Sequence, residues 1–447
     1  MQRSQEMKIM INNMIFADFH IHSRFSRATS KNINIKNLEK YARIKGLDIL
    51  GTGDFTHPKW MEEIRSELSE GTNGIFTTQT GFKFILQTEI SLIYSKGGKG
   101  RRIHLLVLAP SINVADKITE ELKKHGRVDY DGRPIFGISA PDFVKMIKAI
   151  SDDIEIIPAH AWTPWFGVFG SKSGFDSLEE CFEDEIKEIH AIETGLSSDP
   201  PMNWRLSSLD NINLVSNSDS HSFWPWRIGR EATIFKIKNL SYKAIIAAIR
   251  TGEGLFGTVE VDPGYGKYHL DGHRKCNYST EPDVAAKENN LCPICHKKLT
   301  LGVLHRVNEL SDRPKGFVLK NAKKYYEILP LFEIISKTMR TSLSSKKAMA
   351  KYFDMMKDFN NEFEILLKAD RKKLVASCGS DLADNIIKNR NNEIRVEAGY
   401  DGVYGKAILN DVSESKNEVK KPIKSLENEH NKDDENNKGS GSLFDYM

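Results

Sequence analysis

The segment Asp18-Phe19-His20-Ile21-His22-Ser23 follows an apolar run close to the start of the chain. Alternate side chains of an extended strand point to the same side, so His20 and His22 can reach one metal ion. A His-x-His pair alone is weak grounds for a metal site, because a single histidine is more often a structural residue. Its weight comes from the acidic and histidine residues that end later apolar runs.

Those later residues repeat one arrangement, in which a short apolar run is followed by a residue that can bind a metal. The candidate metal ligands of the whole series are His20, His22, Asp54, His57, Glu89, His104, His160, Glu193, Asp219 and His221. Helical periodicity falls between the runs, around residues 112–126, 141–151 and 240–250. Strands that alternate with helices predict an α/β fold with a mostly parallel sheet and its helices packed outside.

Ligands that span residues 20 to 221 must converge if they serve one site. In a (β/α) barrel the carboxyl ends of all strands meet at one rim, so the pattern favours a barrel over an open sheet. One member of the series stays open at this point: the Glu193 carboxylate is a ligand, the partner of a ligand, or a carboxylate of the barrel rim.

Composition and length set the bounds of the prediction. The chain has 447 residues, of which 28% are charged and 39% hydrophobic, a profile typical of a soluble protein with one large and at least one smaller domain. No apolar run approaches the ~20 residues of a membrane span, residues 1–10 lack the apolar core of a signal peptide, and the five cysteines are unevenly spaced. We therefore expect a cytoplasmic protein with no membrane partner. The net charge of +3 leaves any affinity for nucleic acid to local basic patches.

Six motifs resemble those of the PHP (polymerase and histidinol phosphatase) family: Asp18 to Ser23, Gly53 to His57, Thr88-Glu89, Ile103 to Val107, Pro158 to Trp162 and Asn217 to His221. The resemblance implies a distorted (β/α)7 barrel with two or three divalent ions, Zn, Mn or Mg, at its rim. It assigns to the first ion His20, His22, Glu89 and Asp219. Glu89 would bridge to a second ion, held also by His104 and His160. The third ion would have His57 and His221, with Asp54 nearby, although residues 23–30 contain no histidine where some family members supply a further ligand.

Within that family the chain is most similar to the endonuclease Q group. The likeness extends from about residue 14 to about residue 408 and includes Ala161 to Gly167, Ser218 to Ser222, Gly229 to Ala232 and Gly399 to Gly405. Members of the group nick DNA on the 5′ side of deaminated bases, so the resemblance implies a metal-dependent DNA repair endonuclease. The residues to which we assign catalysis are Asp219, Glu89, His221 and Arg230. A small-molecule phosphoesterase of the same family, similar to histidinol-phosphate phosphatase, and a non-catalytic zinc protein associated with DNA or a clamp remain alternatives.

Histidines and cysteines crowd together after the barrel. His273-x-x-Cys276 and Cys292-x-x-Cys295, separated by 15 residues, have the spacing of a zinc ribbon. His269 is an alternative to His273 as the first ligand. Four protein ligands leave no open position on the ion, so the sequence predicts one structural zinc that performs no chemistry.

Basic residues flank the ribbon, and aromatic residues follow the metal-ligand motifs. Both kinds favour contact with DNA, the first through phosphate charge and the second through stacking on bases. Each aromatic taken alone is more often a packing residue of its loop than a contact to DNA. The candidates for contact with DNA are Trp162, Trp165, Phe166, Arg227, Lys297, Lys298 and Arg306.

We expect four parts: a catalytic barrel over 14–258, a zinc-binding module over 259–310, a mostly helical region over 311–408, and a tail over 409–447. The mixed charge of the tail cannot bury a core, which predicts disorder. Its end, Ser440 to Phe444, resembles the C-terminal half of the pentapeptide that binds bacterial sliding clamps, without the leading glutamine and leucine. A sliding clamp is therefore a candidate partner beside DNA.

Overall fold

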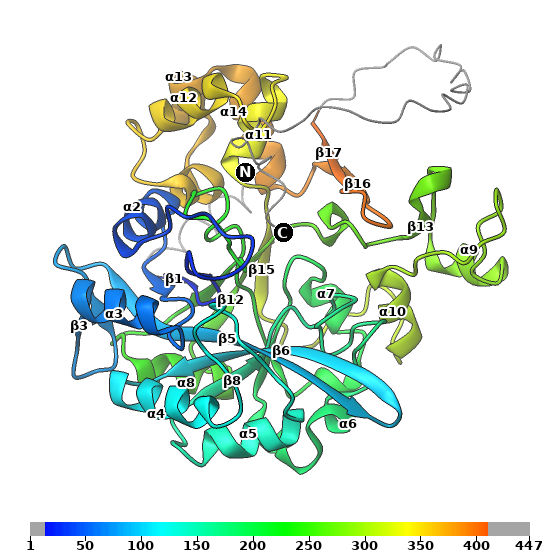
Figure 1. Ribbon diagram of the computed structural model, residues 1–447. Helices are drawn as coiled ribbons and strands as arrows, with labels where there is room; N and C mark the ends of the chain where they lie inside the picture. Colours follow the sequence, from blue (N-terminus) through cyan, green and yellow to red (C-terminus); the bar gives the residue numbers. More distant parts are fainter. Residues whose placement is uncertain (1–13, 410–447) are drawn as a thin grey trace, which may run out of the picture.

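An eleven-stranded mixed sheet organises the chain in the computed structural model, which describes residues 14–409 (Figure 1). Its path is β15-β12-β11-β1-β2-β5-β4-β3, and β6, β7 and β8 join it through β5 and β6. The strands of this sheet are β1 (Ile15–Asp18), β2 (Ile49–Gly51), β3 (Ser69–Glu70), β4 (Phe76–Thr77), β5 (Lys83–Lys96), β6 (Lys99–Ala109), β7 (Ile135–Phe136), β8 (Glu155–Pro158), β11 (Ala232–Phe235), β12 (Leu255–Glu260) and β15 (Lys324–Glu327). The predicted α/β class is confirmed.

Helices cover the sheet and form a separate group beside it. They are α2 (Ile35–Lys45), α3 (Pro58–Glu67), α4 (Ile112–Lys123), α5 (Ala140–Lys148), α6 (Leu178–Phe182), α7 (Pro200–Asn203), α8 (Tyr242–Thr251), α9 (Pro282–Lys287), α10 (Val303–Leu310), α11 (Leu331–Thr338), α12 (Lys346–Met355), α13 (Arg371–Cys378) and α14 (Ser380–Arg390). The three helices predicted between the apolar runs are α4, α5 and α8. In Figure 1, α4, α5, α6 and α8 lie on one side of the sheet and α11 to α14 on the opposite side.

Seven strands follow one another around the rim that carries the candidate ligands: β1, β2, β5, β6, β8, β9 (Ala191–Glu193) and β10 (Asn213–Val215). Ladders join β1 to β2, β2 to β5, β5 to β6, β6 to β8 and β9 to β10. The Ala161 N–H donates to the Glu193 carbonyl between β8 and β9, and an isolated bridge links Ile21 to Ser220 beyond β1 and β10. These two joins have no ladder among the described strands, so the seven-stranded barrel stays a prediction.

The expected mostly parallel sheet is wrong, because β1–β11, β11–β12, β3–β4, β4–β5 and β6–β8 pair antiparallel, as do β5 and β6. These two strands form a long antiparallel hairpin, in which Glu89 pairs with Leu106 and Ser91 with His104. The turn is made by Gly97 and Gly98, both at positive φ, a conformation that glycine adopts without strain. Because β6 runs against β5, the start of the apolar run Ile103 to Leu108, in the middle of β6, lies beside the part of β5 that carries Glu89. This explains why His104 stands near the beginning of its apolar run.

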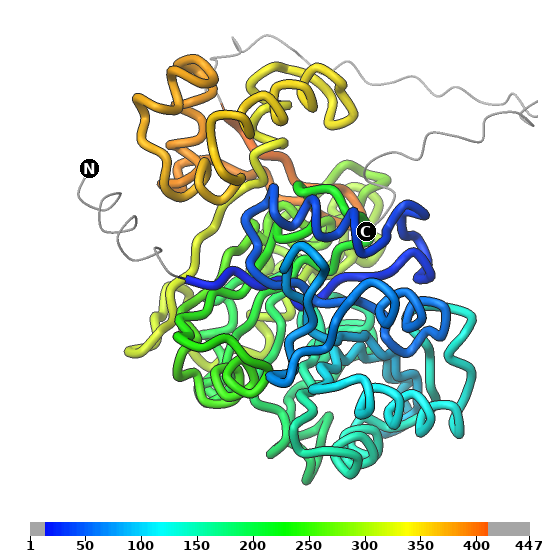
Figure 2. The backbone as a smooth tube through the Cα atoms, turned by 90° about the vertical axis from the view of Figure 1, so that its left-hand side faces the viewer, coloured from blue at the N-terminus to red at the C-terminus, as the bar shows by residue number. Residues whose placement is uncertain are grey.

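The group of helices α11 to α14 packs against β1 and α2 (Figure 2). Phe16 in β1 and Phe363 have ring centroids 4.7 Å apart. The ammonium of Lys45, at the end of α2, lies 2.8 Å from a carboxylate oxygen of Glu362, and both side chains are buried. Segments more than 300 positions apart in the sequence therefore share one core.

The cysteine module and the chain termini complete the described structure. The module contains the hairpin of β13 (Asp271–His273) with β14 (Tyr278–Thr280), then α9 and α10, and a hairpin of β16 (Arg395–Glu397) with β17 (Lys406–Ile408) lies near it (Figure 1). The predicted disordered tail and its clamp motif fall almost wholly outside the described residues. Within residues 14–409 the helices are all too short or too polar to cross a membrane.

Candidate metal centre

Glu89, near the middle of β5, lies where two groups of histidines meet. Its Oε1 is 2.8 Å from His104 Nδ1 and 3.1 Å from His160 Nε2, while its Oε2 is 3.3 Å from His22 Nε2. His20 Nε2 stands 3.6 Å from Oε1. The Glu89 carboxylate is fully buried, so water does not screen its charge from these imidazole rings.

The possible ligand atoms fall into three overlapping groups at this rim, in each of which they lie within 4.8 Å of one another. The groups are His20-His22-Glu89, Glu89-His104-His160, and His22-Asp219-His221. Two nitrogen or oxygen ligands of one tetrahedral Zn²⁺ stand roughly 3.4 Å apart, given bonds of about 2.1 Å. The observed separations of 2.8–3.7 Å match that spacing.

A hydrogen bond to Glu193 fixes which ring nitrogen of His20 faces the centre. His20 Nδ1 lies 2.9 Å from Glu193 Oε2, which leaves Nε2 toward Glu89 and Asp219. That Nε2 atom is buried and has no hydrogen-bond partner among the described residues. A carboxylate that holds the far nitrogen of a histidine is the usual support of a metal ligand. The side chains at the rim therefore fit a divalent ion.

Two carboxylates predicted as metal ligands, Glu193 and Asp54, contact the predicted histidine ligands and lie outside the three groups, so their role as ligands stays a prediction. Glu193 binds His20 Nδ1, accepts the backbone N–H of His160 at 2.8 Å and accepts the amide of Asn217 at 2.9 Å. Asp54 lies 3.0 Å from His22 Nδ1 and accepts the N–H of Ser23. Their oxygens are occupied with these donors, away from the three groups. For Glu193 the alternative of a ligand's partner is the one that the geometry supports.

His57 and His221 share none of the three groups, so the expected third site stays a prediction. His57 stacks on Phe25 with ring centroids 4.3 Å apart, and it belongs to none of the three groups. His221 lies instead beside Asp219, with Nδ1 3.7 Å from Oδ1, and its ring centroid is 4.6 Å from that of His22. His57 is the N-cap residue of α3, and its stacking on Phe25 holds its ring there.

Three residues at the centre have backbone in the left-handed region: Asp54 at φ +37°, His160 at +31° and Asp219 at +47°. Such conformations are rare for residues other than glycine and cluster at functional sites. All three lie in the loops that follow β2, β8 and β10.

Arg133 also lies at the centre, and no sequence pattern predicted it there. Arg133 Nη1 donates to Glu89 Oε2 at 3.0 Å. It lies in a polar turn, Asp129 to Pro134, which carries no metal-ligand spacing, so no pattern pointed to it. The predicted Arg230 is buried, and its guanidinium donates to the Ser218 carbonyl at 3.0 Å beside the Asp219 turn. Burial lowers the pKa of Arg227 to about 10.

The structure corrects two of the residues predicted to contact DNA. Trp162 is 1% exposed, and its indole N–H donates to Asn203, so it cannot stack on a base. Arg306 is buried in α10, where its guanidinium donates to the carbonyls of Phe169 and Phe175. It holds the 161–175 loop in place rather than a phosphate.

Of the other candidates for DNA contact, Trp165, Lys297 and Lys298 are exposed, whereas Phe166 and Arg227 are partly buried. Trp165 is 39% exposed, and its ring meets Tyr268 edge-on at 5.6 Å. The neighbouring Phe166 packs on His104, with centroids 4.3 Å apart. Lys297 and Lys298 are exposed on the cysteine module.

The second predicted metal site assembles at the module. His273, Cys276, Cys292 and Cys295 bring their ligand atoms within 4.8 Å of one another, and His273 Nδ1 is 3.3 Å from Cys295 Sγ. His269 is outside this group, which decides between the two histidines in favour of His273. The site thus offers three thiols and one imidazole, a donor set that suits zinc.

Cys292→Ser is expected to remove close to one zinc per chain and to destabilise the module locally, because the site would lose one of its four donors. Elemental analysis of the purified protein measures the loss. Cys378→Ser is the matched control, since that thiol lies in α13 and donates to the Leu374 carbonyl. Unchanged zinc in Cys292→Ser would contradict the four-ligand assignment.

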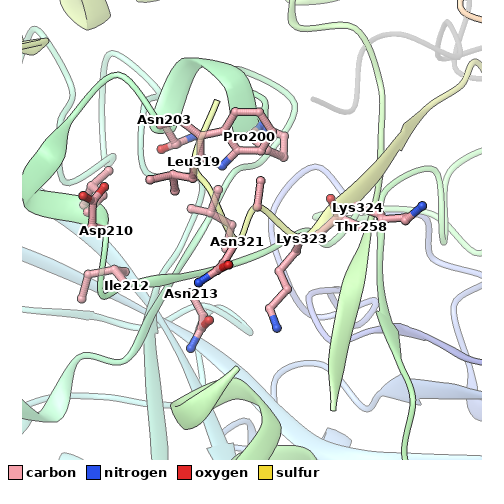
Figure 3. A pocket seen from close by; sticks show the side chains of 14 residues that line it. Pro200, Asn203, Asp210, Ile212, Asn213, Thr258, Leu319, Asn321, Lys323 and Lys324 are labelled. Atoms are coloured by element: carbon pink, nitrogen blue, oxygen red, sulfur yellow. The ribbon is translucent and has the colours of Figure 1, made fainter. Parts of the chain in front are cut away.

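A surface pocket stands apart from both metal sites (Figure 3). It is lined by residues of α7, β10 and the segment before β15, among them Asn203, Asn213 and Lys323. Lys323 Nζ donates to the Gly252 carbonyl, and none of the candidate metal ligands lines the pocket. It contributes nothing to the site at the rim.

Residues 330–393, which contain α11 to α14, match the family model of the MJ0043 C-terminal domain. The chain is 32% identical over 286 residues to the uncharacterized protein MJ0043 of Methanocaldococcus jannaschii, and the match covers 63% of this chain but only 34% of that protein. The uncharacterized protein YqxK of Bacillus subtilis is 27% identical over 411 residues, or 88% of this chain and 98% of YqxK.

Two solved structures are similar over nearly the whole described chain. The first is the lesion-specific endonuclease PfuEndoQ of Pyrococcus furiosus, with a TM-score of 0.79 and 29% identity over 88% of this chain and 95% of its own. The second is endonuclease Q in complex with a 27-mer duplex substrate that has an abasic lesion at the active site. It has a TM-score of 0.79 and 30% identity over 89% of this chain and 97% of its own. The chain belongs to the endonuclease Q family.

Proposed function

We propose that the protein is a metal-dependent DNA endonuclease that nicks the strand on the 5′ side of a damaged base. The observation that carries the proposal is the Glu89-centred rim, in which two histidine groups share one carboxylate, in a chain that matches endonuclease Q over nearly its whole length. A pair of divalent ions supplies activation of water and neutralisation of charge at the phosphate. The seven-stranded barrel and the domain limits expected from the sequence are part of this proposal.

The roles of the side chains follow from their positions. His20, His22 and Asp219 would hold one ion, His104 and His160 a second, and Glu89 both. Glu193 and Asp54 keep the imidazoles of His20 and His22 in the tautomer that presents Nε2. Arg230 supports the Asp219 turn through the Ser218 carbonyl. The cysteine module would bind its zinc as a structural element and present Lys297 and Lys298 to phosphates.

For the substrate we propose deaminated bases. Deamination of adenine or cytosine replaces an exocyclic amino donor by a carbonyl acceptor, so a fixed donor in the pocket accepts hypoxanthine and uracil and opposes the normal bases. One unpaired buried polar group costs roughly 1–3 kcal/mol, or about tenfold to hundredfold in selectivity. Further selectivity arises because a mispaired base costs less to extrude from the stack. The loops after His160, Glu193 and His221 surround the rim and are the places to seek the donor.

The test uses purified protein with Mg²⁺ or Mn²⁺ and duplexes that carry one hypoxanthine, uracil or abasic site, or no lesion. We expect a single nick 5′ to hypoxanthine or uracil that leaves the base attached and that a chelator abolishes. Equal cleavage of undamaged duplex would indicate an unspecific nuclease, and release of free base a glycosylase. Hydrolysis of a phosphate monoester without action on DNA would favour the small-molecule phosphoesterase.

A further inference from the structure

Arg133 reaches the rim from a turn, Asp129 to Pro134, that belongs to none of the strands that carry the ligands. It follows α4 and leads into β7, which pairs in parallel with β5. The Ser91 N–H donates to the Pro134 carbonyl at 3.0 Å, so the turn is fastened to the same strand that carries Glu89.

A second set of contacts fastens the turn to the loop after His22. The Gly132 N–H donates to the Phe25 carbonyl at 3.1 Å, and Asp131 pairs with Arg27 at 3.1 Å. A Cβ at Gly132 would collide with the Asp54 carboxylate, which holds His22. Only glycine therefore lets the turn approach so closely, and this approach places the next residue at the centre.

The guanidinium of Arg133 meets the centre on one side of Glu89. It donates to Oε2, the oxygen that also faces His22, whereas Oε1 faces His104 and His160. An arginine has five N–H donors, and the described contact with Glu89 uses one of them. The side chain is 24% exposed, so it is open in part to a ligand, and four N–H donors remain beyond the described contact with Glu89.

We infer that Arg133 binds the phosphate that is cleaved, with its remaining N–H donors on the non-bridging oxygens. The planar fork of a guanidinium matches two phosphate oxygens, and the charge opposes the negative charge that develops during the reaction. Glu89 holds one end of the fork and so fixes its direction. This inference rests on the proposed function and adds a catalytic residue to it.

A charge-deletion cycle between the arginine and the phosphate tests the inference through binding. Two duplexes carry the lesion that the wild type cleaves, and one has a methylphosphonate at the cleaved position, which removes one negative charge. Affinity for both is measured by fluorescence anisotropy in Ca²⁺ for the wild type, R133Q, R133K and R127Q. Arg127 is the matched control, because it belongs to the same connection, is 73% exposed and pairs with Asp129.

The wild type and R127Q are expected to bind the neutral linkage about tenfold to hundredfold more weakly than the charged one, the range of a hydrogen bond to a charged group. R133Q should show less than about a threefold difference, and R133K an intermediate one, since lysine keeps the charge without the fork. Single-turnover cleavage by R133Q should fall in parallel, with metal content and unfolding midpoint unchanged.

An equal loss of affinity in R133Q and the wild type would overturn the role of Arg133, as would wild-type cleavage by R133Q. A wild type that cleaves none of the lesion duplexes would instead overturn the proposed function itself. The two outcomes can be told apart, because the role of Arg133 is tested only if the wild type cleaves a lesion duplex.

Discussion

Glu89→Gln is expected to lower the rate of DNA cleavage by at least about a thousandfold, which corresponds to roughly 4 kcal/mol of transition-state stabilisation. Glu89 is the carboxylate shared by the two histidine groups, and both of its oxygens face imidazole nitrogens at 2.8–3.3 Å. The amide of glutamine lacks the negative charge. Its NH₂ group would also face the imidazole nitrogens, whose lone pairs are needed to bind the metal ions. Loss of the shared ligand therefore affects both ions at once.

The measurement is single-turnover cleavage of the preferred lesion duplex, with metal content and DNA affinity determined on the same preparation. Glu121→Gln, on the surface of α4, is the control for removal of a carboxylate. Asp219→Asn should cause a loss of similar size, and the double variant should be little worse than either, because ligands of one centre act as a unit. Cleavage by Glu89→Gln within tenfold of the wild type would remove Glu89 from its shared position.

Much of this centre could be predicted, since the strands that carry it have a simple pattern. The apolar runs before His20, His160, Glu193 and Asp219 are β1, β8, β9 and β10, and each of these residues follows its strand or ends it. The cysteine module was predicted for a similar reason, because Cys-x-x-Cys spacing reflects a local turn around one ion. In both cases the signal is local in the sequence.

The parts that sequence could not supply depend on contacts between distant segments. Whether Asp54 and Glu193 bind an ion or a histidine depends on a difference of a few ångströms across the rim, and all these residue types are common in both roles. Arg133 enters from a turn with no motif of its own. Trp162 and Arg306 look like DNA-contacting residues until their burial is known. The parallel sheet was an expectation from alternation, and the Gly97-Gly98 turn was the overlooked sign of a hairpin.

Lys45→Met is expected to destabilise the protein by about 3–5 kcal/mol, the usual cost when one partner of a buried ion pair is removed. Lys45 Nζ lies 2.8 Å from Glu362 Oε1, and the two side chains are 1% and 0% exposed. Glu362 also accepts the N–H of Leu331 at 3.0 Å and the hydroxyl of Tyr352 at 2.6 Å. Without the ammonium, a buried carboxylate remains with neutral donors alone, between the sheet and the α11–α14 helices.

The same helix offers the control for this prediction. Arg43 pairs with Glu39 at 2.8 Å on the exposed face of α2, and Arg43→Met should cost less than about 1 kcal/mol because water screens that pair. Urea unfolding followed by circular dichroism compares the two variants. Since Glu362 lies within the matched 330–393 segment, loss of the pair should loosen that segment first, and hydrogen exchange in α11 should rise before exchange in β5. Equal stabilities of Lys45→Met and Arg43→Met would show that this buried pair does not hold the helices to the sheet.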